Sequence, residues 1–270
     1  MVIPVHDINP VRRTPWVTYG LIVANVIVFL LTPGNSTSIS GAANAKQQCQ
    51  QLAFYDHYAA IPTELTHNDP LNLVASDHVG RSANGVGCTL ERPTYHKKPF
   101  LSAITSQFLH GGWLHLLGNM LFLFIFGNNV EDRFGRIRFL LFYLASGIVA
   151  AYGFAFADPN SHETLIGASG AIAGVLGAYL VLYPRARVWS LVPFLLFIPL
   201  RLPAWLVLGL WFVLQWAYAS GAAVSSAGDV AYLAHVFGFA FGFLIAMVVR
   251  QIAGPGPQPQ LPARRRRPAW

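Results

Sequence analysis

Six long apolar stretches constrain this chain more than any other feature of its sequence. Only 11% of its 270 residues are charged and 54% are hydrophobic, whereas roughly a quarter of the residues of a soluble domain are charged. Runs of about 20 apolar residues have the length needed to cross a bilayer. The sequence therefore predicts an all-α polytopic membrane protein with six spans, at Trp16–Leu31, Trp113 to about Val130, Ile137–Phe156, Leu165–Leu182, Pro203 to about Ala219 and Val230–Val249.

The segments around these spans divide the chain further. Residues 1–14 form a polar N-terminus with no visible cleavable signal peptide, and residues 15–250 form the six-span domain. Residues 33–100 are a long polar first loop, and residues 251–270 are a Pro- and Arg-rich tail that we expect to be disordered. Val188–Leu200 is apolar but short and contains two prolines, which favours an interfacial or re-entrant piece.

The arginines predict the orientation. An even number of spans places both termini on one side, and clusters such as Arg12-Arg13 and Arg264–Arg267 fall on that same side, which is therefore cytoplasmic. The basic residues flank spans, so the net charge of +7 reflects topology and not nucleic-acid binding. The long loop lies outside with Cys49 and Cys88, which can form a disulfide there or remain two free thiols.

With this topology, the second, fourth and sixth spans all run inward from the outer face. His115, Ser169 and His235 lie near their starts, so the three polar side chains form one shallow layer. Asn119 projects from the same helix face as His115. Small residues repeat every four positions, at Ala234, Gly238 and Gly242 in the sixth span and at either Gly170 and Gly174 or Ala173 and Gly177 in the fourth. These repeats predict that the fourth and sixth helices touch.

Each of these features alone has a simpler explanation. A lone serine in a span usually bonds its own backbone, a lone histidine is more often structural, and glycine ladders mostly mean packing. Polar groups in a bilayer are costly, however, and their joint occurrence at one depth favours a functional site. His110, His115 and His235 could together suggest a metal, but no carboxylate or thiolate lies at their level and the His-Glu-x-x-His pattern is absent. We therefore expect neither metal nor cofactor.

The motifs resemble those of the rhomboid family of intramembrane serine proteases. The resemblance rests on His115-x-x-x-Asn119, on Gly167-Ala168-Ser169-Gly170, on Ala234-His235-Val236-Phe237-Gly238-x-x-x-Gly242 and on Glu131-x-Arg133-x-Gly135. It covers roughly residues 15–250 and implies a six-transmembrane-helix bundle.

The resemblance implies roles for these residues. Ser169 would be the nucleophile and His235 the general base, with His115, Asn119 and the Ser169 N–H as oxyanion donors. Gly167 and Gly170 would allow close approach of the backbone, while Gly238, Gly242, Glu131 and Arg133 would have structural or packing roles.

The imidazole has no obvious acidic partner in the sequence. No Asp or Glu falls in the outer half of a span, and the nearest candidate, Asp229, falls in a loop, so packing and other hydrogen bonds must orient His235. Many family members carry an aromatic residue where this chain has Ala173, and some carry Trp-Arg where it has Leu101-Ser102.

The implied activity is endoproteolysis of single-pass transmembrane proteins near the outer face of the cell membrane, with membrane lipids as the other partners. The fifth span is aromatic-rich and could be a lateral gate or an ordinary aromatic belt. An inactive family member that binds membrane clients, as derlin-like relatives do, is the main alternative. A transporter or channel would need polar residues along the whole path.

Overall fold

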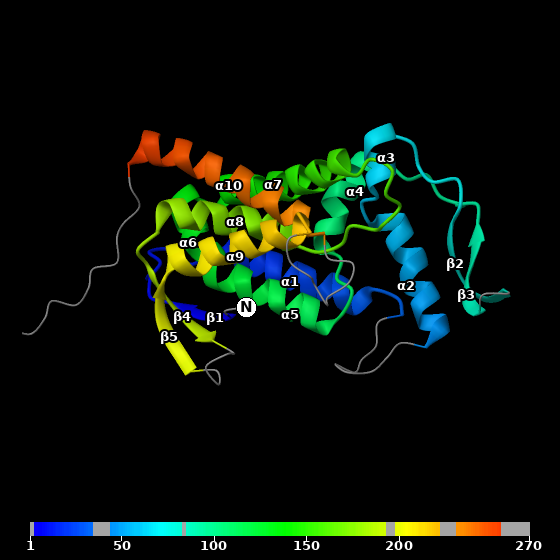
Figure 1. Ribbon diagram of the computed structural model, residues 1–270, viewed down its shortest axis with the longest axis horizontal. Helices are drawn as coiled ribbons and strands as arrows, with labels where there is room; N and C mark the ends of the chain where they lie inside the picture. Colours follow the sequence, from blue (N-terminus) through cyan, green and yellow to red (C-terminus); the bar gives the residue numbers. More distant parts are fainter. Residues whose placement is uncertain (1–2, 35–43, 83–84, 193–197, 222–230, 255–270) are drawn as a thin grey trace, which may run out of the picture.

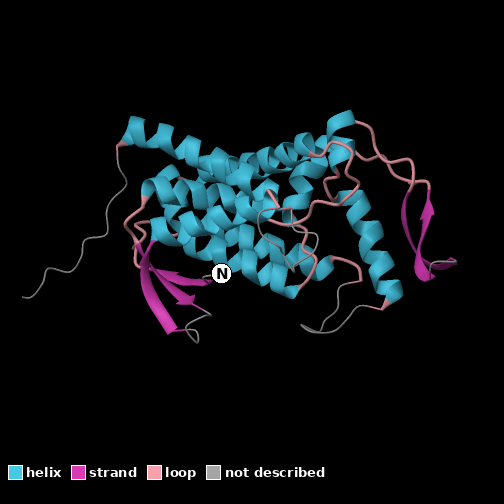
Figure 2. Ribbon diagram, in the orientation of Figure 1, coloured by secondary structure: helices cyan, strands magenta, loops and turns pink. Residues whose placement is uncertain are grey.

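The computed structural model describes residues 3–34, 44–82, 85–192, 198–221 and 231–254. The chain is mostly helical, with a bundle of apolar helices and strands at its two ends (Figures 1 and 2). Asp229 and residues 255–270 of the predicted disordered tail lie outside the described residues, whereas the first residues of that tail, 251–253, are helical and continue α10, so the prediction is wrong for them. The bundle helices are α1 (Trp16–Leu31), α5 (Trp113–Phe122), α6 (Asn128–Phe134), α7 (Arg136–Ala157), α8 (Ser169–Leu182), α9 (Ala204–Ala219) and α10 (Tyr232–Ala253). A π-helical stretch, η2 (Leu123–Gly127), joins α5 to α6.

Helix length bears directly on membrane spanning. Among the described residues, the helices at Trp113–Phe134, Arg136–Ala157 and Tyr232–Ile252 are long and apolar enough to cross a bilayer. The helices α1, α8 and α9 are apolar but have only 14 to 16 residues, which at 1.5 Å per residue is about 21–24 Å. The chain is therefore a helical membrane protein, and length alone supports three of the six predicted spans.

Helix α8 occupies the centre of the bundle, and eleven of its fourteen residues are buried. A β-carbon added at Gly238 or Gly242 on α10 would collide with the carbonyl of Gly170 or Gly174 on α8. One added at Gly177 would collide with the carbonyl of Phe239. The predicted contact between these two helices is thus confirmed, and it depends on glycine because backbone meets backbone.

A three-stranded antiparallel sheet covers one end of the bundle. Its order is β1 (Ile3–Asp7), β4 (Arg187–Val192) and β5 (Ile198–Pro203). The segment Val188–Leu200, predicted to be an interfacial or re-entrant piece, thus contributes to the paired strands β4 and β5, and the chain is not all-α. Of the two prolines that suggested a broken membrane segment, Pro199 lies on the edge strand β5, where a missing N–H is tolerated. Pro193 lies outside the described residues.

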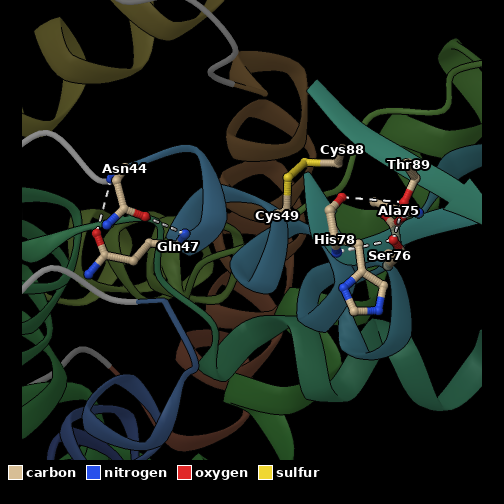
Figure 3. Close-up of a disulfide and its surroundings, with 9 residues drawn as sticks. Asn44, Gln47, Cys49, Ala75, Ser76, His78, Cys88 and Thr89 are labelled. Atoms are coloured by element: carbon tan, nitrogen blue, oxygen red, sulfur yellow. Dashed lines mark hydrogen bonds between the residues drawn. A yellow bond between two sulfur atoms is a disulfide. The ribbon is translucent and has the colours of Figure 1, made fainter. Parts of the chain in front are cut away.

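The long first loop folds into an ordered layer at the opposite end of the bundle (Figure 1). It comprises α2 (Ala45–Tyr58), α3 (Pro62–His67) and the hairpin of β2 (Val74–Ser82) and β3 (Gly85–Glu91), followed by α4 (Pro99–Thr105) and η1 (Ser106–Phe108). We call residues 44–98 the outer layer. A disulfide between Cys49 and Cys88 ties α2 to β3 (Figure 3). A buried ion pair, with 2.6 Å between Lys97 Nζ and Glu64 Oε2, also connects α3 to the segment that precedes α4.

Candidate active site

Ser169 is the first residue of α8, and Leu165, four residues before it, forms an isolated β-bridge with Ala60. The fourth span was predicted to begin at Leu165, but the helix begins four residues later. The Leu165 N–H donates to the Ala60 carbonyl of the outer layer at 2.7 Å, and the Gly167 N–H donates to the Ser106 carbonyl at 3.0 Å. Gly167 has a φ of +119°, which favours glycine. These long-range bonds and this backbone turn hold Ser169 at a helix N-terminus, where backbone N–H groups lack intrahelical partners.

His235 lies against the serine. Its Nε2 atom is 2.8 Å from Ser169 Oγ, although the two residues are 66 positions apart. Both side chains are half-buried. His235 stands one turn before Gly238 on α10, and the glycine contacts described above set the spacing of α8 and α10. Two of the three residues that the sequence placed in one layer, Ser169 and His235, are therefore within hydrogen-bond distance.

The other imidazole nitrogen has a partner that the sequence analysis missed. His235 Nδ1 is 2.7 Å from Oε1 of Gln215 on α9, and Gln215 is buried, with 6% of its surface exposed. The signal was present in the sequence, because Gln215 is a lone amide inside the otherwise apolar run of α9. The sequence predicted that packing and other hydrogen bonds orient His235, but it did not indicate that Gln215 supplies one of them.

His115 lies on α5 and faces the turn at Gly167. A β-carbon added at Gly167 would lie 2.7 Å from His115 Nε2 and 3.6 Å from Ser169 Oγ, so the glycine leaves a space between the two side chains. The Gly111 N–H donates to His115 Nδ1 at 3.5 Å. A neutral imidazole that accepts at Nδ1 carries its proton on Nε2. His115 thus directs an N–H toward the space beside Ser169.

Asn119 lies one turn further along α5 and is buried. Its Nδ2 atom has no hydrogen-bond partner among the described residues. A buried donor without an acceptor is costly, and it is the kind of group that stabilises a negative charge formed during a reaction.

The residues expected to have structural roles make well-defined contacts away from this site. The Glu131 carboxylate accepts hydrogen bonds from the Val17 and Thr18 N–H groups at the start of α1. Arg133 donates to the Gly254 carbonyl at the end of α10. Ala173, four residues after the serine, is fully buried and presents only a methyl group.

Histidines near the site do not form a metal-binding cluster. Within the described ranges, no group of three or more His, Cys, Asp or Glu side chains could hold a metal ion. The ring of His110 lies 5.1 Å from that of His115, centroid to centroid, and is completely buried. Burial lowers the pKa of His110 to about 3, so this imidazole is neutral at pH 7.

Comparison with known proteins finds similarity to rhomboid proteins. A family described as "Rhomboid domain" matches residues 97–252. RHOMBOID-like protein 4 of Arabidopsis thaliana is 28% identical over 261 residues, which cover 91% of this chain and 57% of that protein. Rhomboid protein 1, mitochondrial, of Saccharomyces cerevisiae is 32% identical over 150 residues, covering 53% of this chain and 40% of the relative.

A shorter and more similar match is RHOMBOID-like protein 5 of Arabidopsis thaliana, 36% identical over 91 residues, which cover 34% of this chain and 29% of that protein. The chain thus spans less than two thirds of the length of these relatives.

Proposed function

The chain belongs to the rhomboid family, and we propose that it is an intramembrane serine endopeptidase that uses Ser169 and His235. The observation that carries the proposal is the 2.8 Å separation of Ser169 Oγ and His235 Nε2 beside the donors of α5. A catalytically silent relative that only binds clients has no need of a paired nucleophile and base.

The chemistry follows from these positions. Ser169 Oγ attacks the scissile carbonyl carbon while its proton passes to His235 Nε2. The carbonyl oxygen becomes an oxyanion, and the Ser169 N–H, His115 Nε2–H and Asn119 Nδ2–H donate to it. His235 then gives the proton to the leaving amine, which leaves an acyl-enzyme. A water molecule, deprotonated by the same imidazole, releases the acid and regenerates the serine.

Contacts between helix ends support six membrane crossings. Two residues bonded at the same membrane face must be separated by an even number of crossings. Glu131, near the end of the span Trp113–Phe134, bonds Thr18 at the start of α1. That span supplies one crossing between them, so α1 must supply the other.

The same parity argument reaches the remaining short helices. Strand β1 precedes α1 and pairs with β4, which follows α8. Helix α1, the span Trp113–Phe134 and α7 give three crossings between those strands, so α8 must be the fourth. Arg133 bonds Gly254, and α7, α8 and α10 lie between them, so α9 must cross as well. Six crossings and the arginine distribution support the proposal that both termini are cytoplasmic and that the catalytic pair lies near the outer face of the cell membrane.

The proposed substrates are single-pass transmembrane proteins. A helix in a bilayer hides its carbonyls in internal hydrogen bonds, so the substrate must unwind locally before Ser169 can attack. A small residue at the cleaved bond favours such unwinding and leaves room beside Gly167. The proposal includes entry of the substrate between α9 and its neighbours. Trp205 and Trp216 of α9 are exposed, which fits a lateral gate and an ordinary aromatic belt equally well.

The proposal is tested in proteoliposomes with a single-span substrate. The wild type is expected to cut it, whereas Ser169→Ala and His235→Ala are expected to lose cleavage while keeping their unfolding temperature. Cleavage that survives in Ser169→Ala would refute the serine assignment. A folded wild type that binds several substrates without cutting any would favour the client-binding alternative.

A further inference from the structure

Gln215 is an unusual residue for its position. It is the one amide in a helix that otherwise presents mainly aliphatic and aromatic side chains, and its side chain is buried. Burying an amide costs free energy unless it forms hydrogen bonds. The 2.7 Å contact from Gln215 Oε1 to His235 Nδ1 provides one.

This contact specifies where the imidazole carries its proton. An amide oxygen only accepts hydrogen bonds, so His235 Nδ1 must donate. In a neutral imidazole Nε2 is then unprotonated and accepts from Ser169 Oγ, 2.8 Å away. The two contacts are satisfied together only in the tautomer that a general base requires.

Helix α9 also provides an aromatic neighbour of the imidazole, in addition to Tyr232 of α10. Trp211 is one turn before Gln215 and therefore shares its helix face. The Trp211 ring lies 6.0 Å from the His235 ring, centroid to centroid, at 32°. Helix α8 offers only the methyl group of Ala173 four residues after the serine.

We infer that Gln215 is a positioning residue that holds His235 in the Nδ1-protonated tautomer, so that the catalytic pair is complete only while α9 packs against α10. The inference rests on the proposed function. Unlike the acid of a catalytic triad, the amide is neutral: it orients the ring but adds little stabilisation to an imidazolium. Nucleophile and base are joined through glycine contacts of α8 and α10, whereas the orienting group comes from a third helix.

The kinetic test compares three variants. Gln215→Met keeps the volume but removes the acceptor, and is expected to lower kcat about 10- to 100-fold, the loss of one buried hydrogen bond, with KM within about twofold because no substrate contact changes. Gln215→Glu keeps an acceptor oxygen at the same reach and is expected to retain kcat to within about fivefold. Val213→Met is the matched control, because Val213 lies on the same helix but is exposed. Unchanged kcat in Gln215→Met, or equal losses in the Met and Glu variants, would overturn the inference.

A second test does not depend on cleavage. The chain has nine histidines, and comparing ¹⁵N-histidine spectra of the wild type and His235→Gln identifies the His235 signals. We expect protonated Nδ1 and bare Nε2 in the wild type, and a mixture of tautomers in Gln215→Met. A wild-type proton on Nε2 would mean that the amide presents its nitrogen, and the inference would be wrong. If the wild type cuts no substrate, the proposed function fails, and these spectra still decide the role of Gln215.

Discussion

The carboxylate of Glu131 holds Thr18 twice, through the backbone N–H and through the hydroxyl, each at 2.7 Å. Glu131 is 113 residues from Thr18, yet its side chain occupies the place that an N-cap residue would fill for α1. It also accepts from the Val17 N–H at 3.0 Å. The N-terminus of α1 thus depends on the side chain of Glu131 in α6, which is distant in the sequence but adjacent in space.

Replacing that side chain should destabilise the bundle. Glu131→Ala leaves buried donors of α1 without an acceptor, and we expect the free energy of unfolding to fall by about 2–4 kcal/mol. Glu131→Gln keeps one acceptor oxygen and should lose less. Denaturing-detergent titration in mixed micelles measures both. Equal stability of the wild type and Glu131→Ala would show that solvent or another group replaces the cap.

Gly167→Ala should separate folding from activity. The added methyl group would lie 2.7 Å from His115 Nε2, in the space proposed for the oxyanion, and φ of +119° disfavours alanine. We expect kcat to fall at least about 100-fold. Gly118→Ala is the matched control, since a β-carbon there meets nothing within 4 Å. Gly167→Ala with wild-type turnover would contradict the proposed oxyanion position.

Asp7 should make the stability of the end of the bundle that carries the three-stranded sheet depend on pH. Burial raises its pKa from 3.8 to about 6, although Tyr179 and Asn129 donate to it. Because the folded pKa exceeds the unfolded one, the folded state holds the proton more tightly. The contribution of Asp7 to the free energy of unfolding is about 3 kcal/mol below about pH 4, and it is lost as the pH rises through about 6.

Asp7→Asn should remove this dependence. Unfolding measured between pH 4 and 7.5 is expected to show a falling contribution in the wild type and a flatter profile in the variant, which keeps an acceptor oxygen for Tyr179. A wild-type profile that rises over this interval, and that the substitution leaves unchanged, would contradict the raised pKa.

Loss of the disulfide should loosen the outer layer before the bundle. Cys49 and Cys88 are 39 positions apart in the sequence. A disulfide that closes a loop of this length contributes about 3–4 kcal/mol to the free energy of unfolding. In Cys49→Ala/Cys88→Ala, hydrogen exchange should rise in α2, β2 and β3 and change little in α8. The wild type treated with a reductant should behave like the double variant. Exchange that rises uniformly through the bundle would mean that the two parts unfold as one unit.

Features with a local physical cause were predicted well. Helix α1 has the predicted bounds because an apolar run between a proline and polar residues defines it. The contact of α8 with α10 was predicted because glycines at four-residue spacing leave a helix surface that only another backbone can fill. His115, Ser169 and His235 were predicted to lie at one depth, and the structure brings them to one end of three helices.

Features that depend on distant partners were missed or left open. The sheet joins strands from the N-terminus and from the α8–α9 connection, and no local pattern pairs Ile3 with Leu191. Helix α8 starts late because bonds to Ala60 and Ser106 hold Leu165 and Gly167 outside the helix. The pairing of Cys49 with Cys88 and the contact of Gln215 with His235 both require knowledge of which helices and strands become neighbours.

The pairing of β1 with β4 also sets an order of assembly. Strand β1 is synthesised before its partner, because Leu191 is made nearly 190 residues after Ile3. At about 5–20 residues per second, β1 waits about 10–40 s for its neighbour. During this interval the backbone donors and acceptors of β1 lack their partners in β4. The three-stranded sheet can form only after α8, the helix that carries the serine, has been made.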